Sequence, residues 1–232
     1  MEGLRIVGNP NEFAKKYYEN NIDELLFVDN VASLYQRSYM ADIVRQTVKD
    51  IFIPITVGGG IKSIKDVEVL LKNGADKVAI NTAAVKNPIL LKEISREFGS
   101  STLVLYIEAK KISNKSYEVF TNCGRERSYI SVEDWVLKTQ EYGIGEILLT
   151  SIDKEGTRKG FDLSLVKTVF DLAEVPLIVN GGFGKENHLI DLLNHYKISG
   201  VAIADAFHFN RIKVDNLKTT LEENNFSIRK IN

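Results

Sequence analysis

Short apolar runs alternate with amphipathic stretches along the whole chain. Each apolar run has the length of a buried strand, whereas the stretches between them carry apolar residues at helical spacing. Ser63–Asn73 illustrates such a helix, because Ser63 is a good N-cap and Gly74 lies where a helix ends. The predicted strands are 24–29, 53–57, 77–81, 102–108, 146–151, 176–179 and 200–204, with a small β excursion at 117–121. This alternation predicts an α/β fold around a parallel sheet.

The stretch Ile53–Ile61 combines a proline, a buried strand and three glycines, and a helix is expected just after it. Glycine lets backbone N–H groups approach a ligand closely, and the N–H groups at a helix start attract anions such as phosphate. The same device returns at 175–184, where Pro176 lies 122 positions after Pro54. Neighbouring strands repeat at nearly the same offset. The chain therefore predicts a (β/α)8 TIM barrel built from two half-barrel repeats.

The repeat also indicates which strand of the barrel is not among the predicted ones. The strand at 102–108 begins the second half, and its counterpart in the first half would precede Met1. We therefore expect a barrel without its first strand, in which Met1–Asn9 is the end of the first strand-to-helix loop. A true start further upstream is the alternative, and the sequence leaves both open. A barrel that lacks one strand has two unpaired sheet edges.

Length and composition agree with one barrel. At 232 residues the chain has the usual length of this fold, so we expect a single domain over residues 1–232. The net charge of −1 gives no electrostatic argument for nucleic acid or a membrane surface, and we find no signal peptide or membrane-spanning run. The single cysteine, Cys123, excludes an internal disulfide and indicates a reducing, cytoplasmic setting. The histidines show no metal-ligand spacing, so no metal or cofactor is expected.

Five segments together carry a family resemblance. They read DELLFVD at 23–29, TVGGGI at 56–61, GADKVAINTAAV at 74–85, GEILLTSID at 145–153 and FHF at 207–209. With these segments the chain resembles, over almost its full length, the cyclase subunit of imidazole glycerol phosphate synthase from histidine biosynthesis.

The resemblance implies a barrel that binds a bis-phosphorylated ribonucleotide across one rim. A separate glutaminase subunit, docked at the opposite end as a heterodimer, supplies ammonia through the barrel interior. The ammonia then drives cyclisation and cleavage into imidazole glycerol phosphate and an aminoimidazole carboxamide ribotide. In the family, two aspartates at the ends of the first and fifth strands act as general acid and base.

The resemblance also implies two phosphate sites, each built on a glycine loop. The residues that match the first site are Gly59, Gly60, Asn81 and Thr82. Those that match the second site and its neighbouring loop are Gly156, Thr157, Gly181, Gly182, Gly184 and Asp205. The alternative is that the glycines only form tight turns. At Asp205 the family usually has serine, and a carboxylate within ~4 Å of a phosphate costs about 4 kcal/mol at an effective dielectric constant of about 20. We therefore expect Asp205 to oppose phosphate binding unless it turns away, takes a proton or pairs with a cation.

Glu108 stands where the family has the aspartate of the fifth strand. A glutamate can transfer the same proton, but its extra methylene displaces the carboxyl group, and a misplacement of about 1 Å can cost ~10²-fold in rate. The alternative is a structural carboxylate that pairs with Lys110 or Lys111. The aspartate of the first strand has no counterpart in this sequence, and Glu155 or Asp153 are the candidates to replace it.

Charged residues stand at the starts of three predicted strands. In the family such residues form a ring where ammonia enters, and the matching positions are Glu24, Lys77 and Glu146. Asp76 matches a position at the glutaminase interface. The alternative is an ion-pair plug that fills this end of the barrel.

Three functions stay open from the sequence. The first is the cyclase subunit of histidine biosynthesis, which uses ammonia from a glutaminase. The second is a paralogue that delivers ammonia from a glutaminase for amidation of a surface-polysaccharide sugar, and the third is a non-catalytic barrel. Because one acid–base group is absent and the other is altered, we expect this sequence, as it starts at Met1, to be a very poor cyclase.

Overall fold

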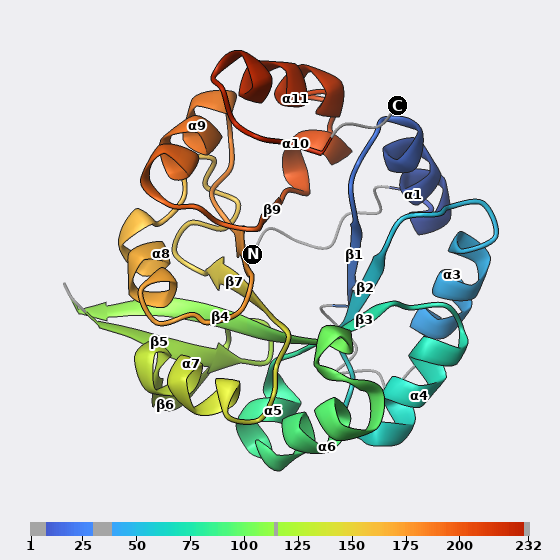
Figure 1. Cartoon of the computed structure of the whole chain (residues 1–232), viewed down its shortest axis with the longest axis vertical. Helices are drawn as coiled ribbons and strands as arrows, with labels where there is room; N and C mark the ends of the chain where they lie inside the picture. The colour runs from blue at the N-terminus through green and yellow to red at the C-terminus, as the bar shows by residue number, and fades with distance from the viewer. Residues whose placement is uncertain (1–7, 30–38, 114–115, 230–232) are drawn as a thin grey trace.

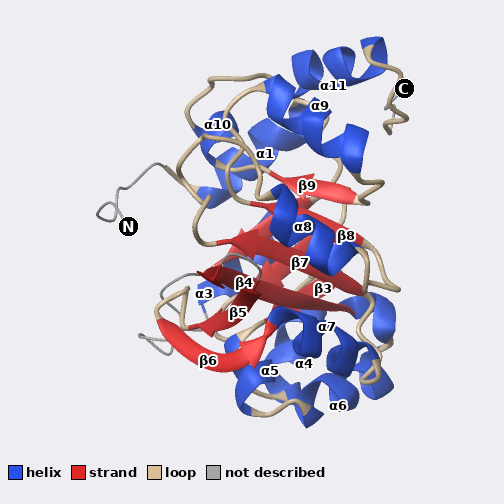
Figure 2. Ribbon diagram, turned by 90° about the vertical axis from the view of Figure 1, so that its left-hand side faces the viewer, coloured by secondary structure: helices blue, strands red, loops and turns tan. Residues whose placement is uncertain are grey.

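The structure is a computed structural model that describes residues 8–29, 39–113 and 116–229. Parallel strands form a curved sheet at the centre, and helices surround it on the outside (Figures 1 and 2). Along the sheet the strands are β1 (Leu25–Val28), β2 (Ile55–Gly58), β3 (Lys77–Ile80), β4 (Leu103–Ser113), β7 (Glu146–Ser151), β8 (Leu177–Asn180) and β9 (Gly200–Ala202). This arrangement confirms the predicted α/β TIM-barrel fold.

The helices follow the strands in sequence and cover the outer face of the sheet. The longer ones are α1 (Pro10–Glu19), α3 (Tyr39–Thr47), α4 (Ile64–Lys72), α6 (Ile89–Phe98), α7 (Val132–Gln140), α8 (Leu163–Phe170), α9 (Glu186–His195) and α11 (Val214–Glu223). The predicted start of α4 is confirmed, since the Ser63 side chain accepts a hydrogen bond from the Asp66 N–H. Gly74 follows its C-terminal end with φ of +103°, the conformation that favours glycine there.

Two apolar layers result from the alternation of side chains along each strand. On β4, Leu103, Leu105 and Ile107 are fully buried between the sheet and the outer helices. Val104 and Tyr106 point to the other side, where they pack with side chains of β3, β7 and β8 inside the barrel. Glu108 continues this inward series at the end of the strand. The interior layer therefore ends in a carboxylate.

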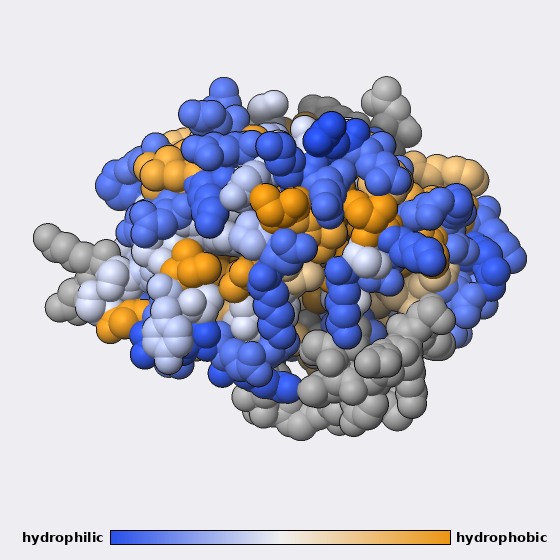
Figure 3. All heavy atoms as spheres, turned by 90° about the horizontal axis from the view of Figure 1, so that it is seen from below, coloured by the Kyte–Doolittle hydropathy of each residue, from blue (hydrophilic) through white to orange (hydrophobic). Residues whose placement is uncertain are grey.

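Apolar and hydrophilic side chains of the described residues are mixed on the face of the molecule seen from below. In Figure 3, apolar patches are scattered singly between hydrophilic side chains, which is ordinary for a protein surface. None of the helices in the described part of the chain combines the length and the apolar character of a membrane span.

Between β4 and β7 the chain leaves the barrel to form a hairpin. β4 pairs with β5 (Ser116–Thr121), and β5 pairs in turn with β6 (Glu126–Ser131), both antiparallel. The β5 segment confirms the predicted excursion at 117–121, whereas β6 was not predicted. Short helices α5 (Thr82–Lys86) and α10 (Asp205–His208) and the 3₁₀ turn η1 (Ser100–Thr102) were also not predicted, because three to five residues carry too little periodicity.

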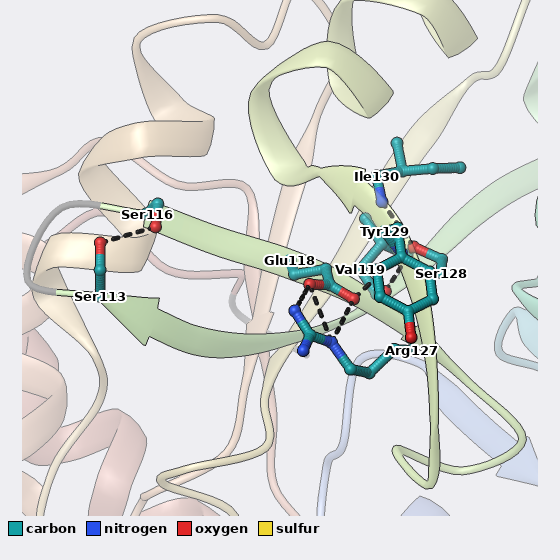
Figure 4. A network of polar contacts seen from close by, with 8 residues as sticks. All are labelled: Ser113, Ser116, Glu118, Val119, Arg127, Ser128, Tyr129 and Ile130. Atoms are coloured by element: carbon teal, nitrogen blue, oxygen red, sulfur yellow. Dashed lines mark hydrogen bonds and ion pairs between the residues drawn. The ribbon is translucent and has the colours of Figure 1, made fainter.

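A buried carboxylate holds the two outer strands of this hairpin together (Figure 4). Glu118 on β5 accepts hydrogen bonds from the Arg127 guanidinium (Nη2 to Oε2, 2.6 Å) and from the Tyr129 N–H (3.0 Å). The strand register shifts beside Glu118, and Tyr129 takes a positive φ of +61°. The Glu118 carboxylate thus replaces the ladder bonds that this irregularity removes.

Among the described residues, β1 and β9 are the two edges of the sheet and do not pair with each other. Side chains of helices join them instead, since α1 lies beside α10 and α11 (Figure 1). The Tyr17 hydroxyl meets His208 Nδ1, and Lys16 Nζ donates to Asn210 Oδ1 at 2.5 Å. Lys218 Nζ donates to Asp23 Oδ1 at 2.7 Å. The part of the predicted Met1–Asn9 loop that covers residues 1–7 lies outside the described residues.

The contact between Tyr17 and His208 involves two neutral groups. Burial raises the pKa of Tyr17 to about 12. Burial, followed by the charge of Lys16, lowers the pKa of His208. The phenol and the imidazole are therefore both uncharged at neutral pH, and the hydrogen bond between them joins two neutral groups.

We expect Tyr17→Phe to lower the free energy of unfolding by about 1 kcal/mol, because it removes the hydroxyl that joins α1 to α10. Urea unfolding followed by circular dichroism measures the change. Tyr18→Phe is the matched control, since the Tyr18 hydroxyl on the same helix has no hydrogen-bond partner in the part of the chain that the structure describes. Equal effects of the two substitutions would contradict this account of ring closure.

Candidate active site

Both glycine loops lie at the same rim of the barrel. One follows β2 and the other follows β8, and these strands run parallel in one sheet. The carboxyl ends of parallel strands share one rim, so the predicted placement of Gly58–Gly60 and Gly181–Gly184 on one face is confirmed. Glu108, at the rim-side end of the barrel part of β4, is the buried acid between them.

Glu108 is held by an amide and not by a lysine. Its Oε2 accepts a hydrogen bond from Asn81 Nδ2 at 2.7 Å, and the same Asn81 nitrogen donates to the Phe120 carbonyl oxygen at 3.0 Å. Lys110, one of the predicted partners, lies over the Phe120 ring instead. The other, Lys111, donates its backbone N–H to Asp153 Oδ2 at 2.7 Å. The alternative in which Glu108 pairs with a lysine is therefore not the observed one.

The surroundings of Glu108 favour its protonated form. Burial raises the pKa of Glu108 to about 7, although the hydrogen bond from Asn81 acts against this, and the charge of Glu155 adds to the increase. Only 6% of the residue is exposed. A carboxyl group whose pKa is near 7 can both donate and accept a proton at neutral pH, which is what general acid–base catalysis requires.

Glu155 is the second acid of this rim. The residue lies in the turn after β7, where its N–H donates to the Ser151 carbonyl oxygen at 2.9 Å. Although Glu155 is exposed as a whole, burial of its carboxyl group raises its pKa. Asp153, the other sequence candidate, is engaged by the Lys111 N–H and therefore caps the extension of β4. Of the two candidates, only Glu155 acts electrostatically on Glu108.

The turn between β5 and β6 folds back over Glu108. The Asn122 N–H donates to Thr82 Oγ1 at 3.0 Å, and the Gly124 N–H acts on the Glu108 carboxylate. Cys123 lies in this turn with a positive φ of +59°, half-buried. Burial, followed by the charge of Glu108, raises the pKa of its thiol. Sequence reasoning treated Cys123 as an ordinary loop residue and missed its position beside the central carboxylate.

The residues of the first predicted phosphate site lie at the ends of neighbouring strands, but two of them already have partners. Asn81 binds Glu108, and the Thr82 hydroxyl accepts the Asn122 N–H, so Thr82 keeps only its own proton to donate. Asn81 Oδ1 is buried and has no hydrogen-bond partner among the described residues. At Gly59 a side chain would collide with the backbone, because a Cβ would lie 2.3 Å from the Asp29 carbonyl oxygen. The glycine at that position is therefore required by packing, whatever its role towards a ligand.

The glycines of the second predicted site interlock with the loop after β7. The Gly160 N–H donates to the Gly182 carbonyl oxygen at 2.9 Å, and a Cβ on Gly182 would lie 2.1 Å from the Gly160 carbonyl oxygen. A Cβ on Gly184 would lie 2.4 Å from the Arg158 carbonyl oxygen. Gly156 has open space around its Cα, while the Thr157 hydroxyl donates to the Lys154 carbonyl oxygen at 2.7 Å. These contacts favour tight loop packing as the direct reason for Gly182 and Gly184.

Asp205 is paired with two arginines that sequence reasoning did not single out. Arg158 Nε and Nη2 donate to its two carboxylate oxygens at 2.7 and 3.2 Å, and Arg211 Nη2 contacts the same carboxylate. The sequence alone gave one signal for Arg158, which follows directly on the predicted phosphate residue Thr157. The sequence left three possibilities for Asp205: turning away, taking a proton or pairing with a cation. The structure shows the pairing with a cation.

A charged cluster closes the opposite end of the barrel. Lys77 Nζ contacts Glu146 Oε1 at 2.6 Å and Glu24 Oε2 at 3.2 Å. Burial lowers the pKa of Lys77, but the combined hydrogen bonds and charges of Glu146 and Glu24 outweigh it, so the pKa is raised overall. Asp76 does not join this cluster, because its Oδ2 accepts the Ile55 N–H at 2.8 Å at the start of β2. The predicted ring is thus a lysine between two glutamates.

In the described ranges, no group of three or more histidine, cysteine, aspartate or glutamate side chains is placed to hold a metal ion. A surface hollow lies on the outer face of α6, among Ile89, Lys92 and Arg96, and shares no residue with the rim.

The structure defines the chain as a TIM barrel with a buried acid and two glycine loops at one rim, and comparison with known proteins identifies the family. A model of the histidine biosynthesis protein family matches residues 1–213. Relatives named imidazole glycerol phosphate synthase subunit HisF match most of the chain as well. The chain belongs to the histidine biosynthesis protein family and, within it, to the HisF family, which confirms the resemblance drawn from the sequence.

Two of these relatives show how much of the chain the likeness covers. The HisF subunit of Legionella pneumophila is 57% identical over 185 residues, which are 80% of this chain and 87% of the relative. The HisF subunit of Streptococcus mutans is 40% identical over 226 residues, which are 97% of this chain and 90% of the relative.

We expect the stability of the protein to decline as the pH rises from about 5 to about 8, because Glu108 must then lose its proton in a buried setting. The folded-state pKa of about 7 lies above the ordinary value of 4.5. The contribution of protonated Glu108 to the free energy of unfolding is therefore fully present below the unfolded-state pKa. It is lost as the pH rises through the folded-state pKa, and the loss amounts to at most about 3 kcal/mol.

Glu108→Gln tests this expectation, since glutamine keeps the shape and has no proton to lose. Urea unfolding at pH 5 and pH 8 should show a smaller decline for the variant than for the native chain. An identical pH dependence in both proteins would contradict the assignment.

Proposed function

We propose that this chain is the cyclase subunit of an imidazole glycerol phosphate synthase, a lyase that acts in cytoplasmic histidine biosynthesis on a bis-phosphorylated ribonucleotide. The single observation that carries the proposal is Glu108, a buried carboxyl group with a pKa of about 7 at the strand end where the family has an acid–base aspartate. The names and high identity of the relatives support the substrate class.

In this proposal Glu108 and Glu155 form the acid–base pair. The two carboxyl groups interact electrostatically, so ionisation of one opposes ionisation of the other. The charge of Glu155 helps to raise the pKa of Glu108 to about 7, so Glu108 is present in both its protonated and its ionised form near neutral pH. Such a group can serve as a general acid or as a general base. Glu155 would take the place of the family's first-strand aspartate.

The proposed phosphate contacts come from both rim loops. The Gly59–Gly60 loop, Asn81 and Thr82 would hold one phosphate, with the Thr82 hydroxyl as donor. The Gly181–Gly184 loop, Gly156 and Thr157 would hold the other, with Arg158 and Arg211 supplying positive charge. Two guanidinium groups against one Asp205 carboxylate leave an excess of one positive charge there, which supports anion binding more than the sequence suggested.

The other end of the barrel would receive ammonia from a glutaminase subunit. The Lys77 and Glu146 side chains are mostly buried, so breaking their ion pair would leave largely buried charge uncompensated, whereas Glu24 is 44% exposed. A docking partner that reorganises these contacts could open a path into the barrel interior. Asp76 would support this surface indirectly through its bond to the backbone of β2.

Because Glu155 can take the place of the missing aspartate, we expect the protein to convert the family's bis-phosphate substrate when ammonium salt is supplied directly, contrary to the very poor turnover expected from the sequence alone. Glu108→Gln and Glu155→Gln should each lower kcat by ~10²–10⁴-fold, because each removes a proton-transferring group. Asp153→Asn is the matched control in the same loop and should change kcat by less than about fivefold, since its carboxylate binds a backbone N–H away from Glu108. Retention of full turnover by Glu108→Gln would overturn the catalytic assignment.

We expect a class I glutaminase subunit to bind at the Lys77 end and to hydrolyse glutamine faster in the complex. Lys77→Ala should weaken this stimulation by about tenfold, because two carboxylates lose their partner, while ammonium-driven turnover stays near its native value. Lys72→Ala, which removes an exposed lysine from the outer helix α4, is the control.

The two assays together separate the functions that the sequence left open. Glutaminase stimulation without any ammonium-driven turnover would favour the paralogue that serves another ammonia acceptor. Absence of both activities would favour the non-catalytic barrel.

A further inference from the structure

Three charged side chains meet beside the glycine loop of β8. Asp205 opens the short helix α10 directly behind β9, and its carboxylate takes two hydrogen bonds from Arg158, one at 2.7 Å and one at 3.2 Å. This is the forked geometry in which a guanidinium also grips a phosphate group. Arg211 approaches the same carboxylate from the loop after α10.

The two arginines are brought together by the fold and not by the carboxylate alone. The Arg158 backbone has a φ of +59° and packs against Gly184 in the interlocked loops. The Arg211 N–H donates to the Ala206 carbonyl oxygen at 2.9 Å, and its guanidinium lies 5.1 Å from the centre of the Phe209 ring. Burial, followed by the charge of Arg158, lowers the pKa of Arg211. The two cations are therefore close enough to repel each other unless an anion lies between them.

Stability is a weak reason for this arrangement. The side chains of Arg158, Asp205 and Arg211 are 51%, 35% and 32% exposed, and ion pairs with such exposure contribute little to folding. The cluster is open to solvent at the rim where the second phosphate is expected, so a dissolved anion can reach it.

We propose that Arg158 and Arg211 form a phosphate-binding pair and that Asp205 occupies this pair in the free protein as an internal competitor. The ligand class is a phosphate monoester. Its two negative charges and three terminal oxygens can engage both guanidiniums, whereas the Asp205 carboxylate brings a single charge. When the phosphate binds, the Asp205 side chain turns away from the arginines.

This inference rests on the proposed function only for the identity of the natural ligand, since it names how one phosphate end of that substrate is selected. It also differs from simple repulsion by Asp205. If Asp205 only repels phosphate, its removal improves binding equally whether or not the arginines are present. If it competes for the arginines, the improvement depends on them.

Titration with inorganic phosphate, followed by the ¹H–¹⁵N signal of Arg158 Nε, tests the proposal at this one site. The signal is assigned by its loss in Arg158→Lys. Asp205→Ser and the isosteric Asp205→Asn should each lower the Kd for phosphate by about tenfold, because each removes the ion pairs that Asp205 forms with Arg158 and Arg211.

The same titration is repeated in an Arg211→Gln background, with Lys159→Gln as a control that removes equal charge from the loop of Arg158. If Asp205 competes for the arginines, Asp205→Ser should improve phosphate affinity by less than about threefold in the Arg211→Gln background. In the Lys159→Gln background it should still improve the affinity by about tenfold. An equal gain in both backgrounds, or no gain at all, would overturn the proposal. Thermal unfolding of each variant verifies that it is folded.

The outcome is separate from that of the cyclase assay. Phosphate can bind in this manner to a barrel without turnover, which would leave the inference standing and refute the proposed function. Turnover without any change in the Arg158 signal on addition of phosphate would support the proposed function and refute this inference.

Discussion

The arrangement of this molecule depends on how the two edges of its sheet are joined. Between β9 and β1 the described residues form no strand ladder, and the link is made by side chains of α1, α10 and the segment around α11. The neutral pair of Tyr17 and His208 belongs to α1 and α10. Because Asp205 and His208 are the two ends of the same short helix, the contact that closes the ring also fixes the position of the charged cluster at the rim.

The long strand β4 connects the barrel interior to the hairpin outside it. Its inward side chains begin in the apolar layer and end at Glu108, and its extension carries β5 and β6 with the turn that folds back over that residue. The Glu118 carboxylate keeps this hairpin rigid where its register shifts. The surroundings of Glu108 are thus built mainly by one continuous segment. Glu155 from the next loop adds to the increase of its pKa, whereas the hydrogen bond from Asn81 on the neighbouring strand opposes it.

The strands and glycine loops could be predicted because each depends on a local pattern: a buried run, a proline before it and glycines after it. The resemblance likewise placed Glu108 and the Lys77 cluster, since both stand at fixed positions relative to predicted strands. The ion pairs of Asp205 could not be predicted in this way. Arg158 is 47 residues away in sequence, and only the interlocked loops bring its side chain to α10. Nor does any local pattern indicate that Asn122 and Gly124 return to the rim, since this depends on the length and curvature of the hairpin.

The interlocked loops after β7 and β8 also constrain how such a chain can change over generations. The Gly160 N–H donates to the Gly182 carbonyl oxygen, and the Gly160 carbonyl oxygen leaves no room for a Cβ on Gly182. Gly184 likewise faces the Arg158 backbone without room for a side chain. An insertion or deletion in either loop would shift every one of these contacts at once. The length of one loop is therefore tied to the length of the other, although the two loops follow different strands.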